Sequence, residues 1–335
     1  IKTTNMIRRR DFRFSFVFLS VLVLIVTGVH SCVKPDTMKK VVYVNSYHSG
    51  FPPSDQITEG VYEKLPADSF NIRPYFMDTK RNPSLEYIEA KASALLDSIK
   101  AADPDLLVVS DDNAVKYLVQ PHLQDQELPV VFCGVNWSAD QYALSRKNIT
   151  GILELLPVEE VMAAMKSQYP SIQSLLVLNE NTTTSRKTKP ILDTVLNSLG
   201  IEVTQTLVDD FEGWKSAFEE GNRSFDIIYL QTQGAIKGWD HAEAKKFIKQ
   251  HIKVPLITCE DHMMPYSVFG MTQVSREQGT WAAETAKKIL RGTPPSKIPV
   301  SENQMVSIWF NPTLAEKVGF QPDPALMEKA RIIND

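Results

Sequence analysis

Short apolar runs alternate with longer amphipathic stretches along most of this sequence, and this alternation restricts the fold more than any other feature. Several runs are apolar on successive residues rather than on every second one, which is typical of parallel strands covered on both faces. Alternation of strands and helices predicts right-handed βαβ units, and therefore an α/β fold with parallel sheets. The predicted strands are 41–46, 71–77, 106–110, 129–133, 174–179, 201–207, 225–231 and 254–258.

Helical periodicity fills the intervals between these runs. In residues 84–101, for example, apolar side chains recur at the spacing of one helix face. Ser54 and Ser84 are predicted N-caps, and Gly200 is predicted to end a helix just before a strand. The other predicted helices are 54–65, 112–119, 157–169, 185–199, 212–220, 239–250 and 275–291.

The alternation comes in two series, 41–133 and 174–258, and a long connection that contains Pro157 divides them. Two α/β halves of similar construction favour a two-lobed binding protein. A length of 335 residues also fits about two domains of ordinary size.

Composition excludes several classes of protein. The chain is 43% hydrophobic and 23% charged, close to the average of globular proteins, which argues against a disordered chain or a coiled coil. Its formal net charge of −4 gives no basic surplus for binding nucleic acid. Residues 1–32 hold five basic side chains and one acidic one, so the remainder carries a net charge of −8. A basic N-terminus ahead of an acidic body is typical of an exported protein.

The N-terminus has the layout of a secretory signal peptide, predicted over residues 1–32. Arginines come first, an apolar run follows from Phe14 to Val26, and small or polar residues precede Cys32. The run is shorter than the roughly 20 residues that span a bilayer, although an uncleaved signal anchor is an open alternative.

Cys32 is the predicted site of lipidation. The sequence Val29-His30-Ser31-Cys32 is similar to a bacterial lipoprotein box, in which the cysteine becomes the lipidated first residue. Several acyl chains anchor a protein more firmly than one chain does. Residues 33–40 would then form a short polar tether from the membrane to an extracytoplasmic body.

Two further cysteines, Cys133 and Cys259, end strand patterns that belong to different halves. A disulfide between them would lock the two halves together. We therefore predict two free thiols.

Residues that directly follow the strands are the candidates for a ligand site. Ligands of open α/β sheets bind beyond the carboxyl ends of the strands, where helix N-termini offer amide donors. These positions are rich in short hydrogen-bonding side chains and include two aromatic rings, which suits a small polar ligand with an apolar portion. The candidates are Ser46, Tyr47, His48, Asp111, Asn113, Asn136 and Trp137 in the first half, and Asn179, Thr182, Gln231, Glu260 and Asp261 in the second.

Other roles are open for some of these residues. Thr182 could simply cap a helix, and Tyr47 could pack in a hinge. Glu260 and Asp261 could act as a general acid and base, although adjacent carboxylates more often form a solvated turn or an ion pair. The sequence has no GxSxG, GxxxxGK[ST], HExxH or CxxC motif, and its six histidines show no metal-ligand spacing. We therefore expect no enzyme activity, no cofactor and no metal.

Residues 41–60, VVYVNSYHSGFPPSDQITEG, resemble the opening of the ABC-transporter substrate-binding protein family related to tryptophan- and tyrosine-binding lipoproteins. The resemblance continues through 104–119, 128–136 and 149–154, and it ends with 306–320. The asparagine–serine–tyrosine–histidine stretch and the FCGVN stretch are its most specific parts.

The resemblance implies a type I periplasmic-binding-protein fold, in which two Rossmann-like lobes with parallel sheets are joined by a three-crossover hinge. Ligand would lie between the lobes. The expected segments are 41–148 plus about 264–300 for lobe one, and about 149–263 plus 301–335 for lobe two.

The function that the resemblance implies is that of a lipid-anchored extracytoplasmic solute-binding protein, a monomer that passes a small molecule to an ABC permease. An amino acid or a related compound is one candidate ligand. The alternative is an accessory protein that presents its ligand to a separate membrane sensor kinase, because the family also occurs as the sensor region of such kinases. Neither function involves nucleic acid.

Overall fold

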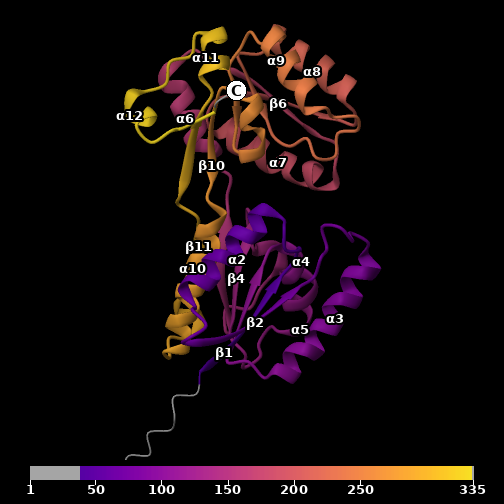
Figure 1. The fold of residues 1–335 in the computed structure, drawn as a ribbon, viewed down its shortest axis with the longest axis vertical. Coiled ribbons are helices and arrows are strands. Elements are labelled where there is room, and N and C mark those ends of the chain that lie inside the picture. Colours follow the sequence, from indigo (N-terminus) through magenta and orange to yellow (C-terminus); the bar gives the residue numbers. More distant parts are fainter. Residues whose placement is uncertain (1–37, 334–335) are drawn as a thin grey trace, which may run out of the picture. The chain divides into compact units, whose positions relative to one another are not determined.

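The computed structural model describes residues 38–333, so the predicted signal peptide and Cys32 lie outside the described residues. Within this part of the chain, two β-sheets are each covered by helices, and we call these two parts lobe one and lobe two (Figure 1). None of the helices between residues 38 and 333 is long and apolar enough to cross a membrane.

The sheet of lobe one is parallel throughout, with the strand order β11-β5-β4-β3-β1-β2. Its strands are β1 (Lys39–Asn45), β2 (Phe70–Phe76), β3 (Leu106–Ser110), β4 (Val130–Asn136), β5 (Ile149–Glu154) and β11 (Ser301–Glu302). Its helices are α2 (Pro52–Lys64), α3 (Leu85–Ala102), α4 (Asp112–Ala114), α5 (Gln120–His122) and α10 (Ser275–Leu290), with shorter turns at η1 (Val115–Val119), η2 (Asp140–Tyr142) and η4 (Pro295–Lys297).

Burial of both faces explains why these strands are apolar on successive residues. Neighbouring residues of a strand point to opposite sides of the sheet. In β1, Val42 belongs to a core cluster that includes Ile88 of α3. The next residue, Tyr43, belongs to a second cluster, with Ile57 of α2 and Ala282 of α10. Each face of the sheet therefore has its own core.

The sheet of lobe two has the order β13-β12-β10-β9-β8-β6-β7, and its β10–β12 pair is antiparallel. Its strands are β6 (Ser174–Glu180), β7 (Glu202–Val208), β8 (Ile227–Leu230), β9 (Leu256–Thr258), β10 (Phe269–Gln273), β12 (Val306–Phe310) and β13 (Arg331–Ile332). Its helices are α6 (Val158–Gln168), α7 (Thr183–Ser198), α8 (Phe211–Ser224), α9 (His241–His251), η3 (Asp261–Tyr266), α11 (Pro312–Val318) and α12 (Pro324–Met327).

The chain passes between the lobes three times, as the predicted hinge requires. Residues 155–157 connect β5 to α6, Val274 connects β10 to α10, and residues 303–305 connect β11 to β12. In Figure 1 the chain runs between the two sheets at these connections. The predicted class, two α/β lobes joined by a three-crossover hinge, is confirmed, with one antiparallel pair added in lobe two.

The lobe boundaries differ from the predicted ones because strand pairing, rather than local pattern, decides them. β5 was expected to open lobe two, but it pairs with β4 in lobe one. Gly151 permits this pairing, since a Cβ there would lie only 2.3 Å from the Phe132 ring. β10 was expected in lobe one, but it pairs with β9 and β12 in lobe two. β11, expected in lobe two, pairs with β5 in lobe one.

Two glycines let α10 return from the hinge and pack closely on α2. A Cβ at Gly279 would lie 1.9 Å from the Ile57 carbonyl oxygen, and a Cβ at Gly60 would lie 2.4 Å from the Arg276 carbonyl oxygen. Real Cβ atoms do not approach that closely, so only glycine allows this separation between the two helices.

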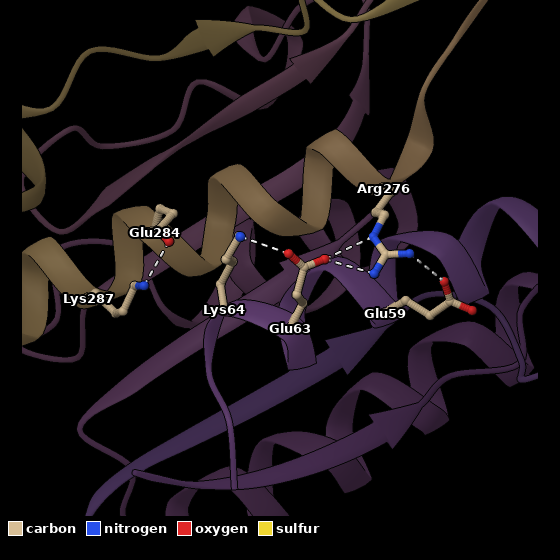
Figure 2. Close-up of polar contacts among 6 residues, drawn as sticks. All are labelled: Glu59, Glu63, Lys64, Arg276, Glu284 and Lys287. Atoms are coloured by element: carbon tan, nitrogen blue, oxygen red, sulfur yellow. Dashed lines mark hydrogen bonds and ion pairs between the residues drawn. The ribbon is translucent and has the colours of Figure 1, made fainter. Parts of the chain in front are cut away.

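An exposed ion-pair network lies beside this contact (Figure 2). Arg276 of α10 donates to Glu63 of α2 through Nε (3.0 Å) and Nη2 (2.7 Å), and its Nη1 lies 3.2 Å from Glu59. Arg276 contacts Glu63 Oε2, and Lys64 Nζ lies 2.7 Å from Glu63 Oε1. Because the network is exposed, water screens its charges and each ion pair contributes little to the stability of the protein.

Two of the three predicted caps are confirmed. Ser84 Oγ accepts from the Tyr87 amide, and Gly200 has φ 69° after the end of α7. The Ser54 prediction is wrong, because α2 begins two residues earlier at Pro52 and Ser54 Oγ donates instead to Asn45 Oδ1 (2.7 Å).

Of the predicted tether 33–40, residues 33–37 lie outside the described residues, and Lys39 and Lys40 already belong to β1. The two described cysteines, Cys133 in β4 and Cys259 after β9, are free and buried, as predicted.

Candidate functional site

Asp111 directly follows β3 at the carboxyl edge of the lobe one sheet. Its backbone has φ 70° and ψ 165°, a region that residues other than glycine rarely occupy and that costs roughly 1–3 kcal/mol. The residue is 7% exposed, and within the described part of the chain its Oδ2 has no hydrogen-bond partner. A buried carboxylate with a strained backbone and one oxygen that lacks a partner is typical of a functional site.

Burial raises the pKa of Asp111 well above its usual range, and the negative charges of Glu154 and Asp112 raise it further. A hydrogen bond with Ser110 and the positive charge of Lys80 oppose this shift. The carboxylate therefore lies in an environment that favours its neutral form unless a cation arrives.

The neighbouring Asp112 has a different role, because its oxygens already have partners. Asp112 Oδ2 accepts from Asn136 Nδ2 (2.7 Å), and Oδ1 accepts from the Tyr142 hydroxyl (2.5 Å). These bonds tie the loop after β4 to the start of α4. Asp112 therefore holds the edge of the site in place.

An aromatic group stands beside these acids. Tyr47 follows β1, and its ring packs edge-on against Phe51 at 5.4 Å. Lys80 Nζ lies 4.6 Å from the Phe51 ring centroid and 5.3 Å from that of Tyr47, within the range of a cation–π contact. Burial and the negative charge of Asp111 raise the pKa of Tyr47 well above its usual value, so its hydroxyl stays neutral. His48 turns to the Ser49 carbonyl instead.

Glu154 is the site residue that sequence reasoning missed. It ends β5 at the first crossover, its Oε1 accepts from Gln273 Nε2 (2.6 Å), and its carbonyl accepts from the Trp137 amide (3.1 Å). Burial, assisted by Asp112, raises the pKa of Glu154 to about 7. Reading 149–154 as a strand would have placed Glu154 among the strand-end candidates.

Trp137 marks the junction between the lobes. It follows β4 of lobe one with φ 61°, and its partly buried side chain packs against the core cluster of lobe two. We therefore place it at the hinge, with its indole committed to packing.

Glu260 of lobe two is affected by charged side chains of lobe one. It follows Cys259 at the end of β9, and burial together with the charges of Glu154 and Asp261 raises its pKa to about 8. Lys80 of lobe one opposes that shift. Carboxylates at the strand ends of both lobes thus act on one another.

Several predicted site residues instead hold the loops around the site. In lobe one, Ser46, Asn113 and Asn136 use their side chains in internal hydrogen bonds. These bonds are Ala114 N to Ser46 Oγ (2.8 Å), Asn113 Nδ2 to Thr79 Oγ1 (2.8 Å) and Asn136 Nδ2 to Asp112 Oδ2 (2.7 Å).

The predicted residues of lobe two divide in the same way. Asn179 is buried, donating to Gln231 Oε1 (2.5 Å) and accepting from Thr232 Oγ1 (3.0 Å). Thr182 caps α7 through the Ser185 amide, the alternative role noted for it. Asp261 is exposed at the start of η3. Between residues 38 and 333, no cluster of His, Cys, Asp and Glu could hold a metal ion.

Comparison with known families gives one match over most of the chain. The family described as "ABC transporter substrate binding protein" matches residues 52–332. A search of curated proteins found no match.

Solved structures similar to this chain share its fold at low sequence identity. A substrate-binding protein with adhesive properties from Clostridium difficile has a TM-score of 0.66 and 17% identity over 88% of this chain and 99% of its own. An ABC domain from Streptococcus pneumoniae in complex with L-Trp has a TM-score of 0.61 and 16% identity, with the same coverage. A conserved domain protein from Vibrio cholerae has a TM-score of 0.61 and 19% identity, again with the same coverage.

Proposed function

Because this chain belongs to the ABC transporter substrate-binding protein family, we propose that it is a lipid-anchored extracytoplasmic protein that captures a small molecule between its two lobes. It would then pass that molecule to an ABC permease. Proteins of this family work outside the cytoplasm and bind solutes rather than transform them. The proposed anchor is the lipidated Cys32.

The observation that carries the proposal is the set of carboxylates at the strand ends of both lobes. Asp111 and Glu154 of lobe one act electrostatically on each other, and Glu154 acts on Glu260 of lobe two. A ligand that contacts Asp111 and Glu260 together would bind the closed arrangement better than an open one. Its differential affinity would then shift the hinge equilibrium toward closure.

We assign the predicted site residues to two groups. Those proposed to contact the ligand are Tyr47, Asp111, Gln231 and Glu260, with Glu154 added. Of these, Asp111 has an oxygen without a partner in the described part of the chain. Those proposed to hold the surrounding loops are Ser46, His48, Asn113, Asn136, Trp137, Asn179 and Thr182, whereas Asp261 lies exposed at the start of η3 and is assigned to neither group. Variants of the first group should lose affinity while remaining folded, whereas variants of the second should lose stability as well.

An amino acid is the candidate ligand class. The Streptococcus pneumoniae structure of the same fold holds L-Trp. The rings of Tyr47 and Phe51 offer an apolar surface beside polar groups here, and such a combination suits a ligand with both characters.

A distance measurement between the lobes tests the proposal. Spin labels on cysteines introduced at the exposed positions Glu89 in α3 and Lys245 in α9 report the separation of the lobes. We expect the small-molecule fraction of a cell extract to narrow and shorten the distance distribution of the full chain in detergent. The same label pair in an Asp111→Asn, Glu260→Gln variant is the control. An unchanged distribution in the wild type, together with an unchanged melting temperature, would contradict the proposal.

A further inference from the structure

We propose that Glu277 fixes the third crossover to lobe one and thereby sets the points at which the hinge bends. This inference rests on the proposed closure of the two lobes and names the residue that guides it. Glu277 lies in the first turn of α10, just after the second crossover.

The first argument is the pair of backbone amides that Glu277 binds. Residues 303–305 lie in neither a helix nor a strand of the described chain, so regular backbone pairing does not fix Gln304 and Met305. Glu277 Oε1 accepts from the Gln304 amide (2.9 Å), and Oε2 accepts from the Met305 amide (2.7 Å). Hydrogen bonds to a charged group are roughly twice as strong as neutral ones. One carboxylate therefore holds two successive residues of the third crossover.

The second argument is the rigid attachment of Glu277 itself. Its helix, α10, packs on α2 at a separation that only glycine allows. The next residue, Gln278, is buried, and its side chain donates to the Leu153 carbonyl (2.9 Å) and accepts from the Gly134 amide (2.9 Å). The start of α10 is thus tied to β4 and β5. Glu277 moves with lobe one, and the segment that it holds moves with it.

A further contact joins the third crossover to the first. Asn303 Oδ1 accepts from the Leu155 amide (2.7 Å), and Asn303 Nδ2 donates to the Leu155 carbonyl (3.2 Å). The following residue, Leu156, already packs against the core cluster of lobe two. Pro157 then restricts the chain further, because its ring fixes φ. The first crossover can therefore bend only after Leu155.

These contacts leave few places for the bend. It is confined to Leu156 in the first crossover, Val274 in the second and the junction after Met305 in the third. A hinge in which few residues absorb the change of φ and ψ guides two lobes along one path. Loss of Glu277 would free the torsions of Gln304 and Met305, and the open protein would spread over more arrangements of the lobes.

Hydrogen exchange of the full chain in detergent tests the contact. Glu277→Ala removes the acceptor and suits a helix. We expect the amides of Gln304 and Met305 to exchange at least about tenfold faster in this variant. Glu284→Ala is the matched control on the same helix, because its carboxylate pairs with Lys287 (2.7 Å) and should not affect these amides. Equal exchange in Glu277→Ala and the wild type would overturn the proposal.

The distance between the lobes separates a positioning role from a merely structural one. Spin labels at positions 89 and 245 report it in dialysed protein without added ligand. We expect a broader distance distribution in Glu277→Ala than in the wild type or Glu284→Ala, with a melting transition that verifies folding. Faster exchange with an unchanged distribution would also overturn the proposal. Glu277→Gln keeps one acceptor oxygen, should give an intermediate width, and replaces the alanine variant if that variant does not fold.

Failure of this inference can be told apart from failure of the proposed function. The small-molecule fraction of a cell extract is added to the same labelled proteins. If the extract shortens the wild-type distance and the ligand-free Glu277→Ala distribution matches that of the wild type, closure stands and the role of Glu277 is wrong. If Glu277→Ala broadens the distribution and the extract changes neither protein, the role of Glu277 stands and the proposed function fails.

Discussion

Gln273 Nε2 donates a 2.6 Å hydrogen bond to Glu154 Oε1, and this bond joins the last residue of β10 to the last residue of β5. Both residues stand where the chain leaves one lobe for the other. The bond therefore braces two of the three crossovers against each other. It also lowers the pKa of Glu154, against the larger effect of burial.

Removing this brace should destabilise the protein in a pH-dependent way. Gln273→Leu leaves a buried carboxylate without its donor, which costs about 1–3 kcal/mol. We expect Gln273→Leu to lower the free energy of unfolding by this amount at pH 8.5, where Glu154 is ionised. The decrease should be smaller at pH 5.5, where Glu154 is protonated. Urea unfolding at the two pH values measures both. Gln304→Leu, at an exposed position in the third crossover, is the control and should cost less than about 0.5 kcal/mol. Equal decreases in the free energy of unfolding at the two pH values would contradict the role of Gln273 as donor to the ionised Glu154.

The stability of the ligand-free protein should fall as the pH rises through neutrality. The pKa values of Glu154 and Glu260 are about 7 and about 8 in the folded protein, above the ordinary 4.5. At pH values between 4.5 and these raised pKa values, the folded state binds more protons than the unfolded state. The free energy of unfolding therefore decreases as the pH rises.

The window for this loss runs from about pH 4.5 to pH 8. The charged groups that act on the two carboxyls are Asp112, Glu180, Asp261 and Lys80. Urea unfolding across the window measures the slope, and the Glu154→Gln, Glu260→Gln double variant should flatten it. A slope unchanged in the double variant would show that other groups are responsible.

The close contact between α2 and α10 should not tolerate a side chain at Gly279. A Cβ there would lie 1.9 Å from the Ile57 carbonyl oxygen, which is backbone and cannot swing away. We expect Gly279→Ala to cost at least about 2 kcal/mol in the free energy of unfolding. Gly234→Ala is the matched control, since its Cβ would meet nothing closer than 3.8 Å. Equal stability of the two variants would show that the helices can separate without cost.

The proposed anchor depends on one cysteine. Cys32→Ser should abolish incorporation of radiolabelled palmitate and move the protein from the membrane fraction to the soluble fraction. Multiple acyl chains give stable anchoring, so the shift should be nearly complete. Cys133→Ser, at a buried thiol, should keep both the label and the membrane location. If the Cys32→Ser variant still incorporates palmitate, Cys32 is not the lipidated residue.

Reasoning from the sequence named most of the residues that we propose for the ligand site. Strand-end position alone selected Tyr47, Asp111 and Glu260, because the geometry of a parallel sheet sends every strand end to one edge. It also selected Ser46 and Asn179, whose side chains prove to be used in holding loops. Residue type and position cannot separate these two groups, since both are short polar side chains at the same edge.

The sequence by itself determined most of the elements, because their signals are local, although it did not predict the strands over 149–154 and 269–273. Runs such as 106–110, apolar on successive residues, predict strands covered on both faces, and two core clusters lie on the two faces of that sheet. Only the tertiary structure decided which strands share a sheet and which carboxylates act on one another. Glu154 and Gln273 are 119 residues apart, and Glu154 acts on Glu260 from the other lobe. Contacts between residues so far apart in the sequence depend on how the elements pack. The pairing of β4 with β5, for example, requires Gly151 beside the Phe132 ring. A local sequence pattern does not contain this information.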